Sequence, residues 1–339
     1  MDTSVGTAWF SFMICMILIG VAGSRLSRYG DAIAEKTGTG GTWIGLILLA
    51  TVTSLPELMT GVSSVTLADT PDITLGDILG ACIFNLMLLA ILDVMTAGEP
   101  LYCRINRGHI LSAGFGIILT GIVGFNLLIG TGGRMLSIGH VGLYSIALIV
   151  LYAIAVRTVF RYEQLHRRKP PEETAERYPD LTLRQAIVQC ALCSLVVVGT
   201  GLWLPFIGAE LARVMGWEQS FIGTLFIAIA TTVPETVVSI AALRLGAFDM
   251  AVSNLLGSNL FNVQIVAIDD LFYTKGPLLS HVAAQHTVSA FTVVIMSAVV
   301  IVGLIYRPRK RLFGTFDWTS LFLIALYMLN SFVLYLYGH

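Results

Sequence analysis

Apolar residues fill ten long segments of this chain, and the polar and charged residues gather between them. Each segment is long enough to cross the hydrocarbon core of a bilayer as a helix, which takes about 20 residues. The apolar residues do not alternate with polar ones, which excludes a transmembrane β-barrel. The pattern predicts an all-α integral membrane protein with ten transmembrane helices, at residues 7–27, 42–67, 75–97, 109–129, 138–158, 185–206, 217–243, 249–272, 284–306 and 317–337.

The composition leads to the same class of protein. Of the 339 residues, 56% are apolar and 12% are charged, and the mean hydropathy is +0.82. Soluble domains carry about 25% charged residues. The net charge of −1 and the lack of a basic cluster give no reason to expect a nucleic-acid partner. The six histidines have no metal-ligand spacing, and we interpret them as interfacial or solvated.

The basic residues predict how the chain is oriented. If the N-terminus is outside, the loops after the first, third, fifth, seventh and ninth segments are cytoplasmic. These loops hold 17 of the 20 Lys and Arg residues, as the positive-inside rule requires of cytoplasmic loops. We therefore expect a multi-pass protein of the plasma (inner) membrane, with the N-terminus and the C-terminus both outside.

The two halves of the chain repeat one another. Residues in the first half recur 178 positions later as the pairs Gly30 and Gly208, Ala34 and Ala212, Gly38 and Gly216, Gly45 and Gly223, Thr53 and Thr231, Pro56 and Pro234, Glu57 and Glu235. Further on the offset is 177, as in Asn85 and Asn262. Each half has five segments, an odd number, so the second half enters the membrane upside down. We expect two inverted five-helix repeats, 1–160 and 185–339, joined by a cytoplasmic loop, 161–184.

One motif in each half places an acid and a helix breaker inside an apolar segment. The two copies are Thr53-Ser54-Leu55-Pro56-Glu57 and Thr231-Thr232-Val233-Pro234-Glu235. A carboxylate at that depth costs roughly 2.5–3.5 kcal/mol on insertion scales. Proline has no N–H to donate, so it opens the helical backbone. Inverted repeats with helices broken at matching positions are typical of secondary transporters, with the site where the repeats meet.

The polar side chains around the two motifs offer only oxygen ligands. Three- and four-residue spacing places them on one face of each helix. Carboxylate, hydroxyl and amide oxygens favour hard cations such as Ca²⁺ and Na⁺. The two carboxylates match the charge of one Ca²⁺. The candidate ligands are Glu57, Glu235, Thr53, Thr231, Ser54, Thr232, Asn85, Asn262 and Ser258.

The first copy of the motif is followed by Gly80, Phe84 and Asn85, and the second copy by Gly257, Ser258, Asn259, Leu260, Phe261 and Asn262. Together these residues resemble the α-repeats of the cation/Ca²⁺ exchanger superfamily, closest to prokaryotic-type Na⁺/Ca²⁺ exchangers. The resemblance implies that Glu57 and Glu235 are the central Ca²⁺ ligands. It implies Ca²⁺ contacts from the backbone oxygens of Thr53 and Thr231, and that Asn85 and Asn262 face the centre. It assigns the Na⁺ sites to Ser54, Thr232, Ser258 and the carbonyls of Ala50 and Ala228. It also implies alternating access, with the first and sixth helices sliding against a rigid core.

Two residues depart from the family pattern. Ala81 stands where the second half has Ser258, so one hydroxyl ligand is missing, and Cys82 follows it. Asn262 stands where some members carry an aspartate, which leaves two acids in the motifs. We therefore expect weak Na⁺ binding on the side of the first half, with reduced Na⁺ coupling or a partial shift to protons.

The remaining acids and glycines have simpler interpretations. Asp93 and Asp270 each follow the motif asparagine by eight residues, and we interpret them as solvated acids near the membrane interface, with a role in ion access as the alternative. Asp77 is interpreted as a charge at a helix N-terminus. Five glycines are interpreted as places of close helix packing: Gly20, Gly23, Gly61, Gly199 and Gly201.

The sequence thus predicts a secondary active antiporter that exchanges Ca²⁺ for Na⁺ by alternating access. A Ca²⁺/H⁺ exchanger, or one for another divalent cation, is the alternative, because buried glutamates can carry protons. An intramembrane aspartyl protease is disfavoured because the acids are glutamates after proline. A channel is disfavoured because inverted broken-helix repeats suit alternating access. We expect no enzymatic activity and no cofactor. The expected partners are small cations and the lipid bilayer, with no protein partner evident.

Overall fold

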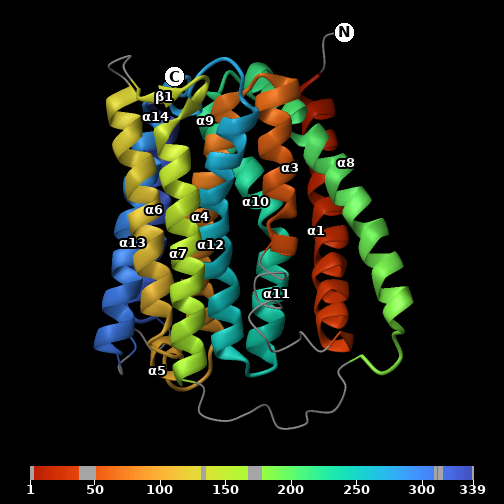
Figure 1. Cartoon of the computed structure of the whole chain (residues 1–339), viewed down its shortest axis with the longest axis vertical. Coiled ribbons are helices and arrows are strands. Elements are labelled where there is room, and N and C mark those ends of the chain that lie inside the picture. Colours follow the sequence, from red (N-terminus) through yellow and green to blue (C-terminus); the bar gives the residue numbers. More distant parts are fainter. Residues whose placement is uncertain are drawn as a thin grey trace.

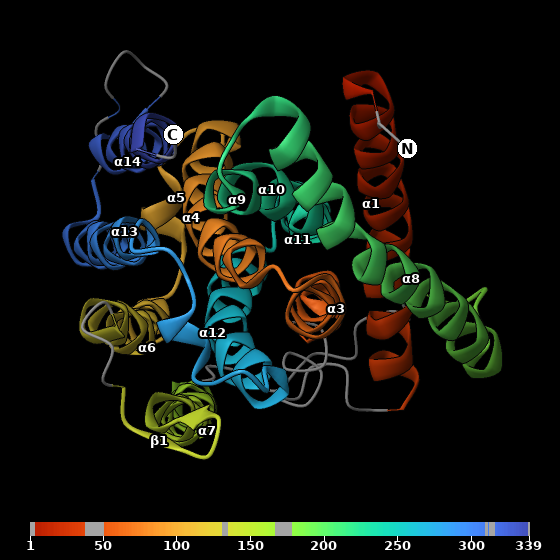
Figure 2. The ribbon, with the colours of Figure 1, turned by 90° about the horizontal axis from the view of Figure 1, so that it is seen from above.

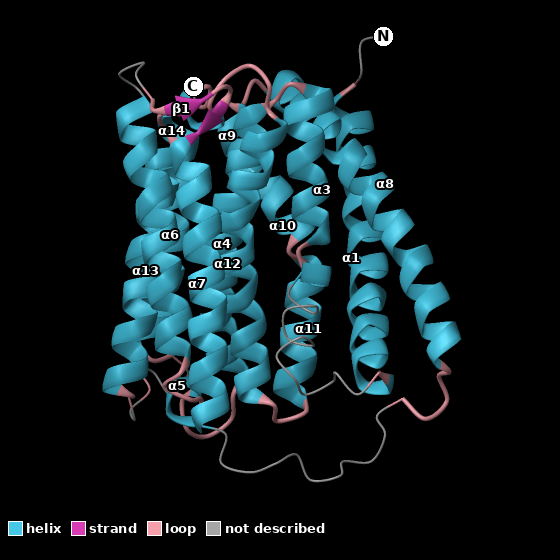
Figure 3. Ribbon diagram, viewed as in Figure 1, coloured by secondary structure: helices cyan, strands magenta, loops and turns pink. Residues whose placement is uncertain are grey.

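The structure is a computed structural model that describes residues 4–37, 51–130, 135–166, 178–308, 311 and 316–337. Helices make up nearly all of this part of the chain, and most run from one end of the molecule to the other (Figure 1, Figure 3). The short helix α5 (Leu101–Arg104) lies at one end, named here the α5 end. At the opposite end β1 (Ser137–Ile138) pairs antiparallel with β2 (Val141–Gly142), and this end is named the ribbon end.

Eight helices in the described residues are long and apolar enough to cross a membrane. They are α1 (Val5–Lys36), α4 (Pro71–Met95), α6 (His109–Gly130), α7 (Leu143–His166), α8 (Leu183–Met215), α12 (Phe248–Phe272), α13 (His286–Tyr306) and α14 (Trp318–Tyr337). A ninth span is broken and bends by 46° between residues Gln219–Thr231 and Val233–Arg244. It consists of α9 (Gln219–Ile222), the π-helical turn η2 (Gly223–Ile227), α10 (Ala228–Thr231) and α11 (Val233–Arg244).

The remaining expected span, 42–67, is described only from residue 51. Residues 51–53 are helical, and they are followed by α3 (Leu55–Ser63) and the π-helical turn η1 (Ser64–Ala68). The 3₁₀ turn η3 (Leu278–Ser280) lies between α12 and α13. The all-helical membrane fold predicted from the apolar pattern is confirmed, and the described helices agree with ten spans in two repeats.

Two helices extend well beyond the membrane-crossing segments that the apolar pattern predicts. α1 has 32 residues and α8 has 33. α8 begins with a capping box, in which the side chains of Thr182 and Gln185 each accept a hydrogen bond from the backbone N–H of the other residue. The helix is capped at its C-terminus by Gly216, where φ is +66°. The extra turns carry charged residues, among them Asp31 and Lys36 of α1 and Glu210 and Arg213 of α8, so apolar content alone did not predict them.

The helices lie in two groups on either side of a central set. α1 and α8 pack together at one side, and α6, α7, α13 and α14 form the opposite side (Figure 2). Between them lie α3, α4, α11 and α12. α1 runs from the ribbon end to the α5 end, whereas α8, its counterpart in the repeat, runs the other way (Figure 1). The two halves are therefore inverted.

α4 and the broken span approach each other so closely that side chains are excluded between them. A Cβ atom on Gly80 would lie 2.2 Å from the carbonyl oxygen of Thr224 and 2.7 Å from the Cβ of Ala228. A Cβ on Gly76 would lie 2.9 Å from the Thr224 nitrogen. This contact places the middle of α4 directly beside α10, where the helix break begins.

The outer surface is apolar, as a lipid-facing surface must be. Phe125, Leu195 and Phe332 are 63%, 68% and 57% exposed on α6, α8 and α14. α4 and α12, in contrast, are the helices most enclosed by the protein. Polar side chains on α4 and α12 therefore face protein and not lipid.

Candidate ion-binding site

The two helix breaks occur at matching residues of the repeats. Ser54 precedes α3 with φ −88° and ψ 16°, and Thr232 precedes α11 with φ −83° and ψ 3°. Pro56 and Pro234 are the second residues of the new helices, where a missing N–H costs nothing. The glutamates follow directly, so each carboxylate lies in the first turn of a helix, at the positive end of its dipole.

Side chains from the two breaks meet across the boundary between the halves. The hydroxyl of Ser54 donates a hydrogen bond to Oε1 of Glu235, at 3.2 Å. The hydroxyl oxygens of Thr53 and Ser258 lie 3.4 Å apart. Residues some 180 to 200 positions apart in the sequence thus share one site, as the inverted repeat predicts.

The two glutamates are buried with most of their oxygens unsatisfied. Glu57 and Glu235 are both 0% exposed. Within the described residues, three of their four carboxylate oxygens accept no hydrogen bond. A buried carboxylate without hydrogen-bond donors is unfavourable unless a cation or a proton neutralises it. The pair therefore has the character of a cation site.

The two asparagines of the candidate set are buried on α4 and α12. Asn85 donates to Oδ1 of Asn259 at 3.0 Å, and Asn259 donates to the carbonyl of Cys82 at 3.2 Å. Asn262 is 0% exposed, and neither of its side-chain polar atoms has a hydrogen-bond partner among the described residues. Cys82 and Asn259 are counterparts in the repeat, so their contact lies where the two halves meet.

The two backbone carbonyls predicted as Na⁺ ligands belong to Ala50 and Ala228. Ala50 lies outside the described residues. The carbonyl of Ala228 accepts the hydroxyl of Thr232 at 2.6 Å and that of Thr231 at 3.2 Å. The role of the Ala228 carbonyl as a Na⁺ ligand stays a prediction. To bind Na⁺, this carbonyl must lose the hydrogen bond from one of the two threonine hydroxyls.

No group of three or more His, Cys, Asp or Glu side chains in the described part of the chain converges as it would around a resident metal. The donor set is instead two carboxylates with neutral hydroxyl, amide and carbonyl oxygens. Such a set fits a hard cation that binds and leaves.

Comparison with known sequences identifies the family. Residues 7–159 and 186–337 match the sequence profile described as "Sodium/calcium exchanger protein". The chain belongs to the sodium/calcium exchanger family. This is a family of transporters, and the resemblance seen in the doubled motif is confirmed.

Individual relatives cover nearly the whole chain. An uncharacterized membrane protein of Methanocaldococcus jannaschii is 23% identical over 321 residues, which is 94% of this chain and 95% of the relative. The structure of the H⁺/Ca²⁺ exchanger CAX superposes with a TM-score of 0.71 at 13% identity, covering 98% of this chain and 86% of that one. The sodium-calcium exchanger NCX_Mj superposes with a TM-score of 0.58 at 20% identity, covering 96% and 98%. These structures show the same fold.

One acid next to the family site was misinterpreted from the sequence. Asp77 is the seventh residue of α4 and 0% exposed, so it is not a charge at the helix N-terminus. Its Oδ1 accepts a hydrogen bond from the hydroxyl of Thr231 at 2.9 Å. The signal was present in the spacing, because Asp77, Ala81 and Asn85 are four residues apart on one helix face.

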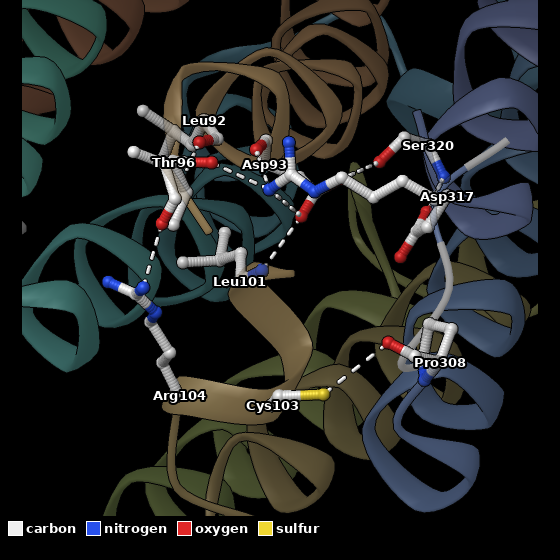
Figure 4. A network of polar contacts seen from close by, with 11 residues as sticks. Leu92, Asp93, Thr96, Leu101, Cys103, Arg104, Pro308, Asp317 and Ser320 are labelled. Atoms are coloured by element: carbon white, nitrogen blue, oxygen red, sulfur yellow. Dashed lines mark hydrogen bonds and ion pairs between the residues drawn. The ribbon is translucent and has the colours of Figure 1, made fainter. Parts of the chain in front are cut away.

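Asp93 and Asp270 are not solvated, because both are 0% exposed. Asp93 accepts the backbone N–H of Leu101 at 2.7 Å and the hydroxyl of Ser320 at 3.0 Å (Figure 4). Asp270 accepts the N–H of Leu278 at 2.7 Å. Both carboxylates thus bind the loop that follows their own helix.

Their other partners give the two acids a structural role. Asp270 also accepts hydrogen bonds from Gly142, Tyr144 and Ser145. Nη2 of Arg311 lies 3.9 Å from Oδ1 of Asp93. Because donors already occupy both Asp270 oxygens, ion access does not account for this acid.

A cavity of about 590 Å³ lies between α1 and α11. Ser24, Ser27 and Asp31 of α1 line it, with Val237 and Ala241 of α11 among the residues opposite. Val237 is two residues from Glu235. The cavity therefore lies on the α5 side of the break in the second half.

Proposed function

We propose that the chain is a secondary active antiporter that exchanges Ca²⁺ for Na⁺ across the membrane by alternating access. The observation that carries the proposal is the pair Glu57 and Glu235, contributed by inverted halves, fully buried, and with three of four oxygens lacking hydrogen bonds in the described chain. One Ca²⁺ neutralises the pair.

The ligand roles follow the family pattern residue by residue. Glu57 and Glu235 bind Ca²⁺, with the backbone oxygens of Thr53 and Thr231. The Na⁺ sites use Ser54, Thr232, Ser258 and the carbonyls of Ala50 and Ala228. Asn85 and Asn262 face the centre of the site. The observed contact from Ser54 to Glu235 supports a shared site, because it joins a proposed Na⁺ ligand to a proposed Ca²⁺ ligand.

The cavity supports alternating access with one open side. We infer that the α5 end faces the cytoplasm and that both termini are outside, in the plasma (inner) membrane, because 17 of 20 basic residues belong to loops expected on that side. The cavity between α1 and α11 then lies on the cytoplasmic side of the break in the second half. Movement of α1 with α8 against the central helices would close it.

Ca²⁺/H⁺ exchange is the second candidate. The observation that favours it is Ala81, which gives the first half a methyl group where the second half has the Ser258 hydroxyl. A proton needs fewer ligands than Na⁺.

Ion flux distinguishes the two. Purified protein in vesicles is loaded with Ca²⁺, and Na⁺ and H⁺ gradients are applied separately. We expect an inward Na⁺ gradient to drive Ca²⁺ efflux. Flux driven by a pH gradient and indifferent to Na⁺ would establish the second candidate, and no Ca²⁺ flux under either gradient would refute both.

A further inference from the structure

The two halves present different chemistry on equivalent helix faces beside the site. On α4 the face carries Asp77, Ala81 and Asn85, and 177 residues later α12 carries Asn254, Ser258 and Asn262. The first half has therefore lost a hydroxyl at one turn and has a carboxylate where its counterpart has an amide at the next. Both changes affect groups that can bind a cation.

The hydrogen bonds of the two break threonines show that these changes are linked. Thr53 lies 3.4 Å from the hydroxyl of Ser258 across the repeat boundary. By symmetry, Thr231 would face residue 81, whose methyl group offers no partner. Thr231 donates instead to Asp77, one turn earlier, at 2.9 Å. Asp77 thus takes the place that the missing hydroxyl would have.

A neutral residue can fill this helix position without any charge. Asn254, the counterpart of Asp77, donates to the carbonyl of Glu235 at 3.3 Å and to the hydroxyl of Ser239 at 3.0 Å. The carboxylate is therefore not required for packing at this point of the repeat. Its presence in only one half calls for another explanation.

Asp77 lacks a neutralising partner. It is 0% exposed, and its Oδ2 accepts no hydrogen bond from the described residues. No Lys or Arg in that part of the chain pairs with it, and Glu57 and Asp269 are both near enough to repel it electrostatically. Asp269 has a donor of its own, the hydroxyl of Thr74, which donates to its Oδ2 at 3.0 Å. A buried carboxylate in this setting is stable only when a cation or a proton neutralises it.

We propose that Asp77 adds a third carboxylate to the ion-binding region and that it binds its own Na⁺ together with Thr231, since the three acids do not converge on one ion. The inference rests on the proposed function, because it extends the site formed by Glu57 and Glu235. Three carboxylates give the empty site three negative charges. Three Na⁺ bring it to zero, whereas one Ca²⁺ leaves it at minus one, so each exchange moves one net charge. With Asp77 neutral, two Na⁺ balance one Ca²⁺ and exchange is electroneutral.

The coupling ratio of reconstituted protein tests the proposal. Ca²⁺ flux is measured in vesicles at set Na⁺ gradients while a K⁺ gradient with valinomycin fixes the voltage, and the voltage of zero flux gives the number of Na⁺ per Ca²⁺. We expect three for the wild type, in place of the reduced ratio expected from Ala81 alone, because Asp77 replaces the missing ligand. We expect two for Asp77→Asn, whose flux then no longer responds to voltage. Asp77→Glu, which keeps the charge, should retain voltage dependence.

A double variant serves as a control for misfolding of Asp77→Asn. Asp77→Asn with Ala81→Ser gives α4 the same three residues that α12 already carries, so the repeat itself shows that the set is compatible with the fold. We expect this variant to regain part of the Na⁺ affinity lost in Asp77→Asn, with a ratio of two. Ala81→Ser alone should keep the ratio of three, which makes it the matched control.

The outcomes separate this inference from the proposed function. Absence of Na⁺-driven Ca²⁺ flux in the wild type overturns the proposed function and this inference with it. Na⁺-driven flux with the same ratio in the wild type, in Asp77→Asn and in the double variant overturns the third carboxylate alone. A wild-type ratio of two has the same consequence.

Discussion

Nε2 of His286 lies 3.0 Å from Oδ1 of Asp72, which joins the start of α13 to the start of α4. The same relationship occurs 177 residues away, where Nε2 of His109 lies 2.9 Å from Oδ1 of Asp249. Because α4 and α12 run in opposite directions, the two pairs lie at opposite ends of the bundle. Each pair connects one half of the chain to the other.

From the sequence we interpret the histidines as interfacial or solvated, and for these two a solvated position is wrong. The side chain of His286 is 0% exposed and that of His109 is 8% exposed. The acids also accept backbone N–H groups, Asp72 from Ala283 at 2.6 Å and Asp249 from Asn106 at 2.7 Å. The repeat therefore extends beyond the ion-site motifs into the contacts that hold the halves together.

His286→Ala should destabilise the protein and leave transport largely intact. It removes a buried partner of Asp72, and a hydrogen bond to a charged group contributes about 1.5–3 kcal/mol. The measurement is the thermal unfolding midpoint in detergent, with Ca²⁺ flux measured in parallel. The neighbouring Thr287→Ala is the control. An unchanged midpoint would show that the pair does not stabilise the fold.

Glu57→Gln and Glu235→Gln should each abolish Ca²⁺ transport. Either change removes one of two charges that oppose a divalent ion while preserving shape, and breaking such a buried pair costs roughly 3 kcal/mol or more, about a hundredfold in affinity. Ca²⁺ uptake into vesicles measures the loss. Glu35→Gln, near the end of α1, should retain uptake. Wild-type uptake in either site variant would contradict the assigned site.

Gly23→Ala should slow transport by changing how α1 contacts the break. A Cβ atom on Gly23 would lie 2.3 Å from Cγ of Pro234, so α1 must shift. Gly201, its counterpart on α8, approaches Met59 in the same way. Gly199→Ala is the matched control, because its Cβ would meet no described atom within 4 Å.

The stability of the two glycine variants should diverge. An alanine in a helix gains about 0.5–1 kcal/mol over glycine where space allows. Gly199→Ala should therefore be neutral or slightly stabilising, whereas Gly23→Ala should lower the unfolding midpoint. Equal midpoints and equal fluxes in the two variants would rule out a role for the close approach of α1 to Pro234.

Cys103 should react with an impermeant thiol reagent only from the cytoplasmic side. It follows the third span, at the α5 end, and its thiol is half-buried and donates to the carbonyl of Pro308 at 3.4 Å. Labelling should therefore be slow. Arg107→Cys, at an exposed position of the same loop, should react faster from the same side. Labelling of either residue from outside intact cells would show that the predicted orientation is wrong.

The sequence alone determined the spans, the inverted repeat and the two helix breaks. Continuous apolar segments specify membrane-crossing helices because no other open structure satisfies its backbone in lipid. Pro56 and Pro234 fix the breaks because proline acts within its own turn of helix. The glycines within the spans also predicted close helix packing. Such packing is found at Gly20, Gly23, Gly61 and Gly201, with Gly199 the exception.

The tertiary structure decided which polar groups are paired. Aspartate and histidine are residue types that are usually found at the protein surface. From the sequence we therefore placed Asp77, Asp93, Asp270 and the two histidines at helix ends or in solvent. Their partners lie up to 227 residues away, as Ser320 does from Asp93. Burial and pairing depend on which helices meet, and helices that meet across an inverted repeat come from opposite halves of the chain. Local sequence therefore could not show that Thr231, deprived of a hydroxyl at Ala81, turns to Asp77.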